Sequence, residues 1–193
     1  MPLPLIHYLY PSRISKFLHH DAKGAASWAL VTSASDGIRK SLCNELSNHG
    51  FNVILHGRNE AKLARVREDL KTAHPERHFR TVTVDASSFT QPDIDRIVAQ
   101  VSDVPLSVLI NDVGGTAPLS SNFKYFGCTA PTEMEELFSI NVQFPMQFTR
   151  AILPQFLLHT QPSIVVTCGS QANIGHPYVA AYSGCKGALH AWN

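Results

Sequence analysis

Three side chains near the end of the sequence have the types and spacing needed for proton transfer at a carbonyl group. Tyr182 and Lys186 are four residues apart, so on a helix they lie on the same face. A phenol, with a reference pKa of about 10, is a poor acid or base at neutral pH, and a neighbouring ammonium group favours the phenolate. We expect Lys186 to activate Tyr182 in this way, and Ser170 to hydrogen-bond a substrate oxygen on which charge develops. A Tyr-x-x-x-Lys pair also occurs by chance on solvated helix faces, so its weight depends on the surrounding elements.

Five short apolar runs and the amphipathic segments between them supply those elements. The runs cover residues 28–32, 52–56, 81–84, 106–110 and 164–167, and helical patterns lie between them, the longest from Thr132 towards Leu158. Strands joined by helices pair in parallel, so the sequence predicts a doubly wound, Rossmann-like α/β domain with helices on both faces of a parallel sheet. We assign this domain to residues 28–193 and treat residues 1–27 as an N-terminal arm.

The loops that follow the predicted strands carry the residues expected to bind a ligand, because ligands of doubly wound domains bind beyond the carboxyl ends of the strands. The first loop, residues 32–39, has small residues that let backbone N–H groups approach a pyrophosphate. The second loop has Arg58 where a ribose-binding carboxylate is usual, which favours the 2′-phosphate of NADP. A plain exposed cation before a helix is the alternative. The next two loops contribute Asp85 and Gly114.

The composition argues against several other classes of partner. The chain has 193 residues, 44% of them hydrophobic, and 16 basic against 15 acidic side chains give a net charge of +1. This balance gives no electrostatic reason to expect nucleic acid. The four cysteines have no paired spacing and the ten histidines form no metal-binding motif, so we expect neither disulfides nor a metal site. No apolar run of about 18 residues occurs, so any contact with a membrane is expected to be peripheral.

From Trp28 to Asn193 the sequence resembles the short-chain dehydrogenase/reductase family. The most similar branch contains 3-ketoacyl-CoA reductases and hydroxysteroid dehydrogenases, and the similarity is carried by ALVTSASDGI, NVILHGRN and YSGCKGAL. The resemblance implies a catalytic tetrad of Asn141, Ser170, Tyr182 and Lys186. Together with the loop residues, the candidate cofactor-binding set is Thr32, Ser33, Ser35, Asp36, Gly37, Ile38, Arg58, Asp85, Asn111, Gly114, Tyr182 and Lys186.

The resemblance implies an oxidoreductase that uses NADP, with NAD less favoured, on a ketone or secondary alcohol of a lipophilic substrate such as a 3-ketoacyl-CoA or a steroid. Tyr182 would pass a proton to the carbonyl oxygen, Lys186 would hold the nicotinamide ribose, and Asn141 would support a relay through water. It also implies a location in the cytoplasm or at the periphery of the endoplasmic reticulum. A homodimer face formed by the phenylalanines of the long helix is one expectation, and burial of the same phenylalanines in the core is the other.

Four features depart from the family pattern and keep a second function open. Ser33 replaces the first loop glycine, so a Cβ strains a turn that glycine makes freely, and Arg39 replaces the third, where it either meets a phosphate or crowds it. Asp112 replaces the second Asn of the family's N-N-A-G segment and adds a negative charge near the cofactor. Family members also continue beyond the Tyr-x-x-x-Lys helix with further strands and a substrate lid, so we expect a shortened chain whose fifth strand is a sheet edge. The alternative function is an inactive member of the family that binds a nucleotide weakly or acts only as an interaction module.

Overall fold

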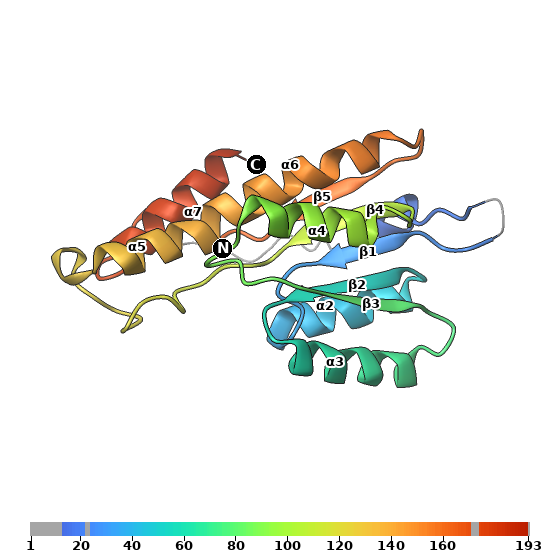
Figure 1. Ribbon diagram of the computed structural model, residues 1–193, viewed down its shortest axis with the longest axis horizontal. Coiled ribbons are helices and arrows are strands. Elements are labelled where there is room, and N and C mark those ends of the chain that lie inside the picture. Colours follow the sequence, from blue (N-terminus) through green and yellow to red (C-terminus); the bar gives the residue numbers. More distant parts are fainter. Residues whose placement is uncertain (1–12, 22–23, 171–173, 193) are drawn as a thin grey trace, which may run out of the picture.

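The computed structural model of the chain describes residues 13–21, 24–170 and 174–192. Five parallel strands form one sheet in the order β3-β2-β1-β4-β5 (Figure 1). The strands are β1 (Trp28–Val31), β2 (Asn52–Gly57), β3 (Phe79–Thr83), β4 (Leu106–Asn111) and β5 (Ile164–Thr167). The predicted doubly wound α/β fold is therefore confirmed, and β5 lies at the edge of the sheet as expected.

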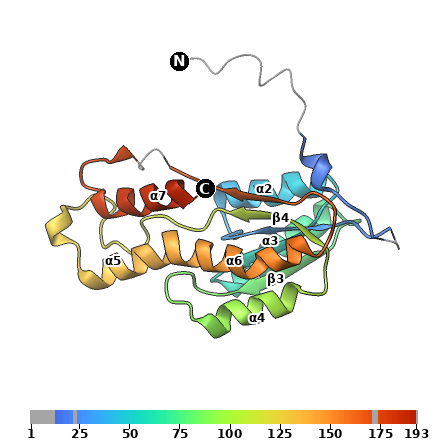
Figure 2. The ribbon, with the colours of Figure 1, turned by 90° about the horizontal axis from the view of Figure 1, so that it is seen from above.

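Helices cover both faces of this sheet. They are α2 (Gly37–Asn48), α3 (Glu60–Ala73), α4 (Gln91–Val101), α5 (Pro131–Phe138), α6 (Phe144–Leu157) and α7 (Ala180–Trp192), with short 3-10 helices η1 (Ile14–Phe17) and η2 (Phe126–Cys128). Helices α2 and α3 cover one face, and α4 and α6 cover the other, while α7 packs beside α5 (Figures 1 and 2). None of the helices within the described ranges is both long and apolar enough to cross a membrane.

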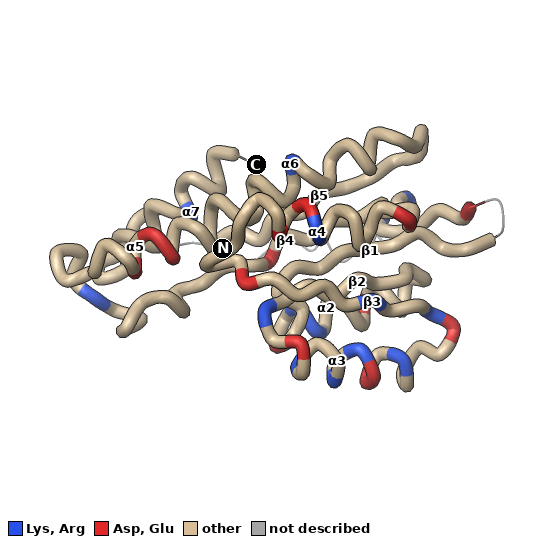
Figure 3. Tube along the Cα trace, viewed as in Figure 1, with Lys and Arg blue, Asp and Glu red and all other residues tan. Residues whose placement is uncertain are grey.

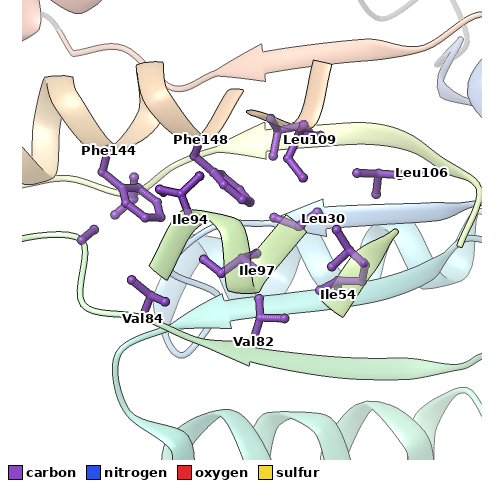
Figure 4. Packing of buried hydrophobic residues seen from close by; sticks show 14 of the residues in the cluster. Leu30, Ile54, Val82, Val84, Ile94, Ile97, Leu106, Leu109, Phe144 and Phe148 are labelled. Atoms are coloured by element: carbon purple, nitrogen blue, oxygen red, sulfur yellow. The ribbon is translucent and has the colours of Figure 1, made fainter. Parts of the chain in front are cut away.

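Alternate residues of β1 face two separate hydrophobic clusters. Trp28 and Leu30 belong to the cluster beneath α4 and α6, whereas Ala29 and Val31 belong to the cluster beneath α2 and α3. Every residue of β1, β2 and β4 is buried, which is typical of parallel strands covered on both faces. Figure 4 shows how Phe144 of α6 and its neighbours pack between the helices and the sheet. This packing fixes the strand ends from which the functional loops leave.

The long helix expected from Thr132 towards Leu158 is interrupted by one wide turn. Residues Ser139–Gln143 form a π-helical turn, η3, in which the N–H of Phe144 donates to the carbonyl of Ser139. Pro145 has no N–H, and in a regular α-helix its ring crowds the carbonyl four residues earlier, which is that of Asn141. Single π-helical turns often occur at functional sites. The turn therefore places the predicted tetrad residue Asn141 at an irregular point of the helix.

Helix α6 has an apolar exposed face as well as a buried one. Phe144, Phe148 and Phe156 are buried in the core of the chain, so the expectation that these residues form a dimer face is wrong. The exposed apolar residues of α6 are Met146, Leu153 and Leu157. Charged residues are frequent along α3 but sparse on α6, as Figure 3 shows. A homodimer stays a prediction, and its interface would have to be formed by residues other than these three buried phenylalanines.

Candidate active site

A cavity of about 300 Å³ lies beyond the carboxyl ends of the first four strands. Its lining contains three cations, Arg39, Arg58 and Lys62, against a single carboxylate, Asp85, so it favours an anionic ligand. Five of the predicted cofactor residues line it, namely Ser33, Ser35, Arg58, Asp85 and Gly114. The remaining lining residues are His56, Gly57, Asn59, Val84, Ala86, Val113, Ala117 and Ile140.

Gly114, in the wall of this cavity, brings two predicted tetrad residues together. A Cβ at this position would lie 2.6 Å from Oδ1 of Asn141 and 3.2 Å from Nζ of Lys186. Gly114 also has a φ of +141°, a conformation that residues with a side chain rarely adopt. Glycine is therefore required both by the backbone and by the two side chains that approach it.

Asn141 is fully buried and holds the loop that follows β4. Its Nδ2 donates to the carbonyls of Gly115 and Leu137, each at 2.9 Å, and its Oδ1 accepts from the N–H of Gly115 at 2.9 Å. The side-chain amide is thus occupied by backbone groups. A role of Asn141 in a water relay would consequently have to use its backbone carbonyl.

Tyr182 and Lys186 lie together on α7, as their spacing predicts. The Nζ of Lys186 is 5.6 Å from the centroid of the Tyr182 ring, and only 6% of Lys186 is exposed. Burial lowers the pKa of Lys186, and the Asp112 carboxylate acts in the opposite direction. Ser170 is partly buried and lies three residues beyond the end of β5, on the loop that leads towards α7.

The other predicted cofactor residues lie outside the cavity lining. Thr32 is buried and ties two loops together, because its Oγ1 accepts from the N–H groups of Asp112 and Val113 at 2.9 Å. Asn111 is also buried, and its Nδ2 donates to Oγ1 of Thr149 at 2.8 Å. Within the described part of the chain, Oδ1 of Asn111 has no hydrogen-bond partner.

The start of α2 carries three more predicted residues. Asp36 caps the helix by accepting from the N–H of Gly37 at 2.7 Å, and Gly37 has a φ of +57°. Ile38 is 76% exposed and does not line the cavity. These residues therefore shape the first loop, and their contact with a cofactor stays a prediction.

Sequence reasoning missed His56, which supports the first loop from β2. Ser33 has a φ of +60°, in the left-handed region that costs a residue with a Cβ about 1 kcal/mol or more. Its N–H donates to Nδ1 of His56 at 3.4 Å, and the His56 ring stacks on Phe144 with 5.0 Å between the ring centroids. In the sequence His56 reads only as the last residue of an apolar run, so no local signal distinguishes it.

We expect His56 to make the protein less stable in mild acid. Burial lowers the pKa of His56 to about 4, although nearby Asp85 opposes the shift. In the unfolded chain the pKa is near 6.5, so the free energy of unfolding should be fully retained above pH 6.5 and should fall between pH 6.5 and 4, by about 3 kcal/mol in total. Denaturant titrations at several pH values measure this fall. In the His56→Leu variant the fall over this range should be smaller by that amount, and equal pH profiles of the two proteins would contradict the assignment.

Comparison with known proteins gives consistent matches. Residues 27–193 match the family model described as short chain dehydrogenase. A very-long-chain 3-oxoacyl-CoA reductase of Coccidioides immitis is 32% identical over 168 residues, which cover 86% of this chain and 47% of that protein. The protein of the same name from Schizosaccharomyces pombe is 29% identical, over 96% of this chain and 56% of its own length. The chain therefore spans about half the length of the curated relatives it matches.

Solved structures agree with the fold. A short chain dehydrogenase from Shigella flexneri 2a, complexed with NADP, has a TM-score of 0.78 at 25% identity and covers 92% of this chain and 71% of its own. One from Escherichia coli CFT073, complexed with NADPH, has a TM-score of 0.79 at 24% identity, covering 94% and 71%. These two structures share the sheet and helix arrangement described above.

Proposed function

The chain belongs to the short-chain dehydrogenase family, and we propose that it transfers a hydride between NADP and the ketone or secondary alcohol of a lipophilic substrate. The observation that carries the proposal is the buried Lys186 beside the Tyr182 ring, next to Gly114 in the wall of a cationic cavity. The 3-oxoacyl-CoA reductases among its relatives support a 3-ketoacyl thioester as the substrate class. A steroid is the second substrate class that the sequence resemblance supports.

The cavity residues fit a dinucleotide. Gly114 lets Asn141 and Lys186 lie close against the cavity wall, and Arg58 follows β2, where the ribose of the adenosine half is expected. We assign the 2′-phosphate to Arg58, which makes NADP the favoured cofactor, and the adenine contact to Asp85. The NADP complexes of two similar structures support the same choice.

The proposed chemistry divides between the cofactor and four side chains. Bound NADPH supplies the hydride that the substrate carbonyl carbon receives. Tyr182 donates the proton to the carbonyl oxygen, and Ser170 donates a hydrogen bond to the same oxygen. Lys186 lies against the ring of Tyr182, from where it holds the nicotinamide ribose. Asn141 fixes the loop that carries Gly114 and so positions Lys186.

A titration of Arg58→Met with both cofactors tests the cofactor assignment. We expect the variant to bind NADPH about 10- to 100-fold more weakly, because a charge-assisted hydrogen bond to a phosphate is lost, and to bind NADH within about twofold of the parent. Fluorescence of the reduced nicotinamide measures both affinities. Arg65→Met is the matched control, since Arg65 is an exposed arginine of α3 that does not line the cavity. An equal loss for NADPH and NADH would contradict the role of Arg58, and a parent that binds neither would contradict the proposed function.

A further inference from the structure

Two residues that differ from the family pattern contact each other in this protein. Arg39, in the first turn of α2, donates from Nε to the carbonyl of Asp112 at 2.8 Å and to its Oδ2 at 3.1 Å. The side chains are 31% and 18% exposed. This ion pair joins the start of α2, the helix that follows β1, to the loop after β4, the strand next to β1 in the sheet. The two differences are therefore one structural feature.

The position of Arg39 relative to the cavity indicates what the ion pair does. Arg39 lines the cavity, whereas Asp112 does not, so the ion pair links a cavity residue to a carboxylate outside the lining. Asp112 accepts hydrogen bonds only from Nε of Arg39. Throughout the part of the chain that the structure describes, neither Nη group of Arg39 makes a hydrogen bond. The two Nη groups, which can donate two parallel hydrogen bonds to phosphate oxygens, are left unused.

We propose that Arg39 binds the pyrophosphate of the dinucleotide and that Asp112 positions it for this contact. The inference rests on the proposed function. The glycine that Arg39 replaces allows close packing of the helix on the strand. At this position Arg39 adds a charged side chain, and Asp112 holds that side chain in place. Arg39 in turn shields the Asp112 carboxylate, which would otherwise repel the phosphates. Arg39 is assigned to the pyrophosphate, and not to the 2′-phosphate, because it lies in the first turn of α2, directly after the loop that carries Ser33 and Ser35, whereas Arg58 follows β2.

The assignment predicts whether each substitution in the pair weakens or strengthens cofactor binding. Arg39→Met keeps much of the aliphatic stem but removes the charge and uncovers Asp112, so NADPH and NADH should both bind about 100-fold more weakly. Asp112→Asn alone should weaken binding about threefold to fivefold, because Arg39 loses its orienting partner. In the Arg39→Met background the same Asp112→Asn change should strengthen binding about tenfold, because the repelling carboxylate is gone.

The experiment is a double-mutant cycle on the full chain, with the affinities for NADPH and NADH and the unfolding temperature measured for all four proteins. The unfolding temperature without cofactor confirms that each variant is folded. Arg96→Met is the matched control, since Arg96 pairs with Asp93 at 2.9 Å on α4 and does not line the cavity. Its affinities should match those of the parent.

Three results would overturn the inference, and they are distinguishable. If Asp112→Asn changes affinity by the same factor in both backgrounds, the pair is structural only and the proposed function stands. If Arg39→Met weakens NADPH but not NADH, Arg39 contacts the 2′-phosphate and not the pyrophosphate. If the parent binds neither cofactor while folded, the proposed function fails and the inference fails with it.

Discussion

Replacing Tyr182 with Phe should lower the turnover of a ketone substrate by about 10²- to 10⁴-fold, the range for loss of a general acid. The Tyr182 phenol lies on α7 beside the buried Lys186, and Phe keeps the ring over which Nζ lies at 5.6 Å. Steady-state oxidation of NADPH with a 3-ketoacyl-CoA as substrate measures the change. The affinity for NADPH should stay within about threefold of the parent, because the variant retains the cavity and its cations.

The control for this variant is a conservative change elsewhere on the same helix. Ser183→Ala alters the next residue, which is buried and whose Oγ accepts from the N–H of His176 at 3.3 Å, and should reduce turnover far less. If Tyr182→Phe retains the parental turnover, Tyr182 is not the acid. If the parent binds NADPH but turns over no ketone, the alternative function, nucleotide binding without catalysis, becomes the better account of the chain.

The alternation of apolar and polar segments was sufficient to predict the fold. Each expected strand is present to within a few residues, because β1, β2 and β4 are buried on both faces and so read as continuous apolar runs. The third strand begins two residues before the expected run, at Phe79, where the sequence alternates less regularly. The apolar runs alone do not fix the strand order β3-β2-β1-β4-β5, because more than one doubly wound order has right-handed crossovers.

The irregular parts of the site could not be predicted in the same way. Pro145 marks an irregularity in the helix, but the apolar periodicity continues unbroken through η3, so the sequence does not show that the hydrogen bonds shift there to π-helical spacing. Arg39 and Asp112 are 73 residues apart and each looks unfavourable alone. Their compensation depends on β1 and β4 lying side by side, which is a tertiary contact. The role of His56 could not be predicted for the same reason, because its partner Ser33 lies on the loop that follows the neighbouring strand, β1.

The two contacts that the sequence does not predict, Arg39 with Asp112 and Ser33 with His56, share a physical cause. Each joins the loop at the end of one strand to a residue on, or just beyond, a neighbouring strand, so the rigid sheet fixes the distance between partners that the loops alone would leave variable. The loops can therefore accept unusual residues, such as Ser33 at a positive φ, as long as the neighbouring strand supplies a compensating group. Substitutions that remove the support should consequently affect the cofactor cavity more than the sheet.

Gly114→Ala should be far more damaging than the same change at the next residue, and this comparison tests the wall of the site directly. Gly114 and Gly115 both have positive φ, at +141° and +129°, so alanine strains the backbone at either position by about 1 to 3 kcal/mol. Only at Gly114 does the new Cβ meet other atoms, 2.6 Å from Oδ1 of Asn141 and 3.2 Å from Nζ of Lys186, whereas at Gly115 nothing lies within 4 Å.

Relative to Gly115→Ala, the Gly114→Ala variant should therefore lose about 1 to 3 kcal/mol more in the free energy of unfolding, measured in denaturant. It should also lose affinity for NADPH, because Asn141 and Lys186 must move away from the cavity wall. Since the two alanines share the backbone strain, the difference between the variants isolates the contact with the two side chains. If both variants are equally stable and bind NADPH equally well, Gly114 is needed only for its backbone conformation, and the close approach of Asn141 and Lys186 plays no part in forming the site.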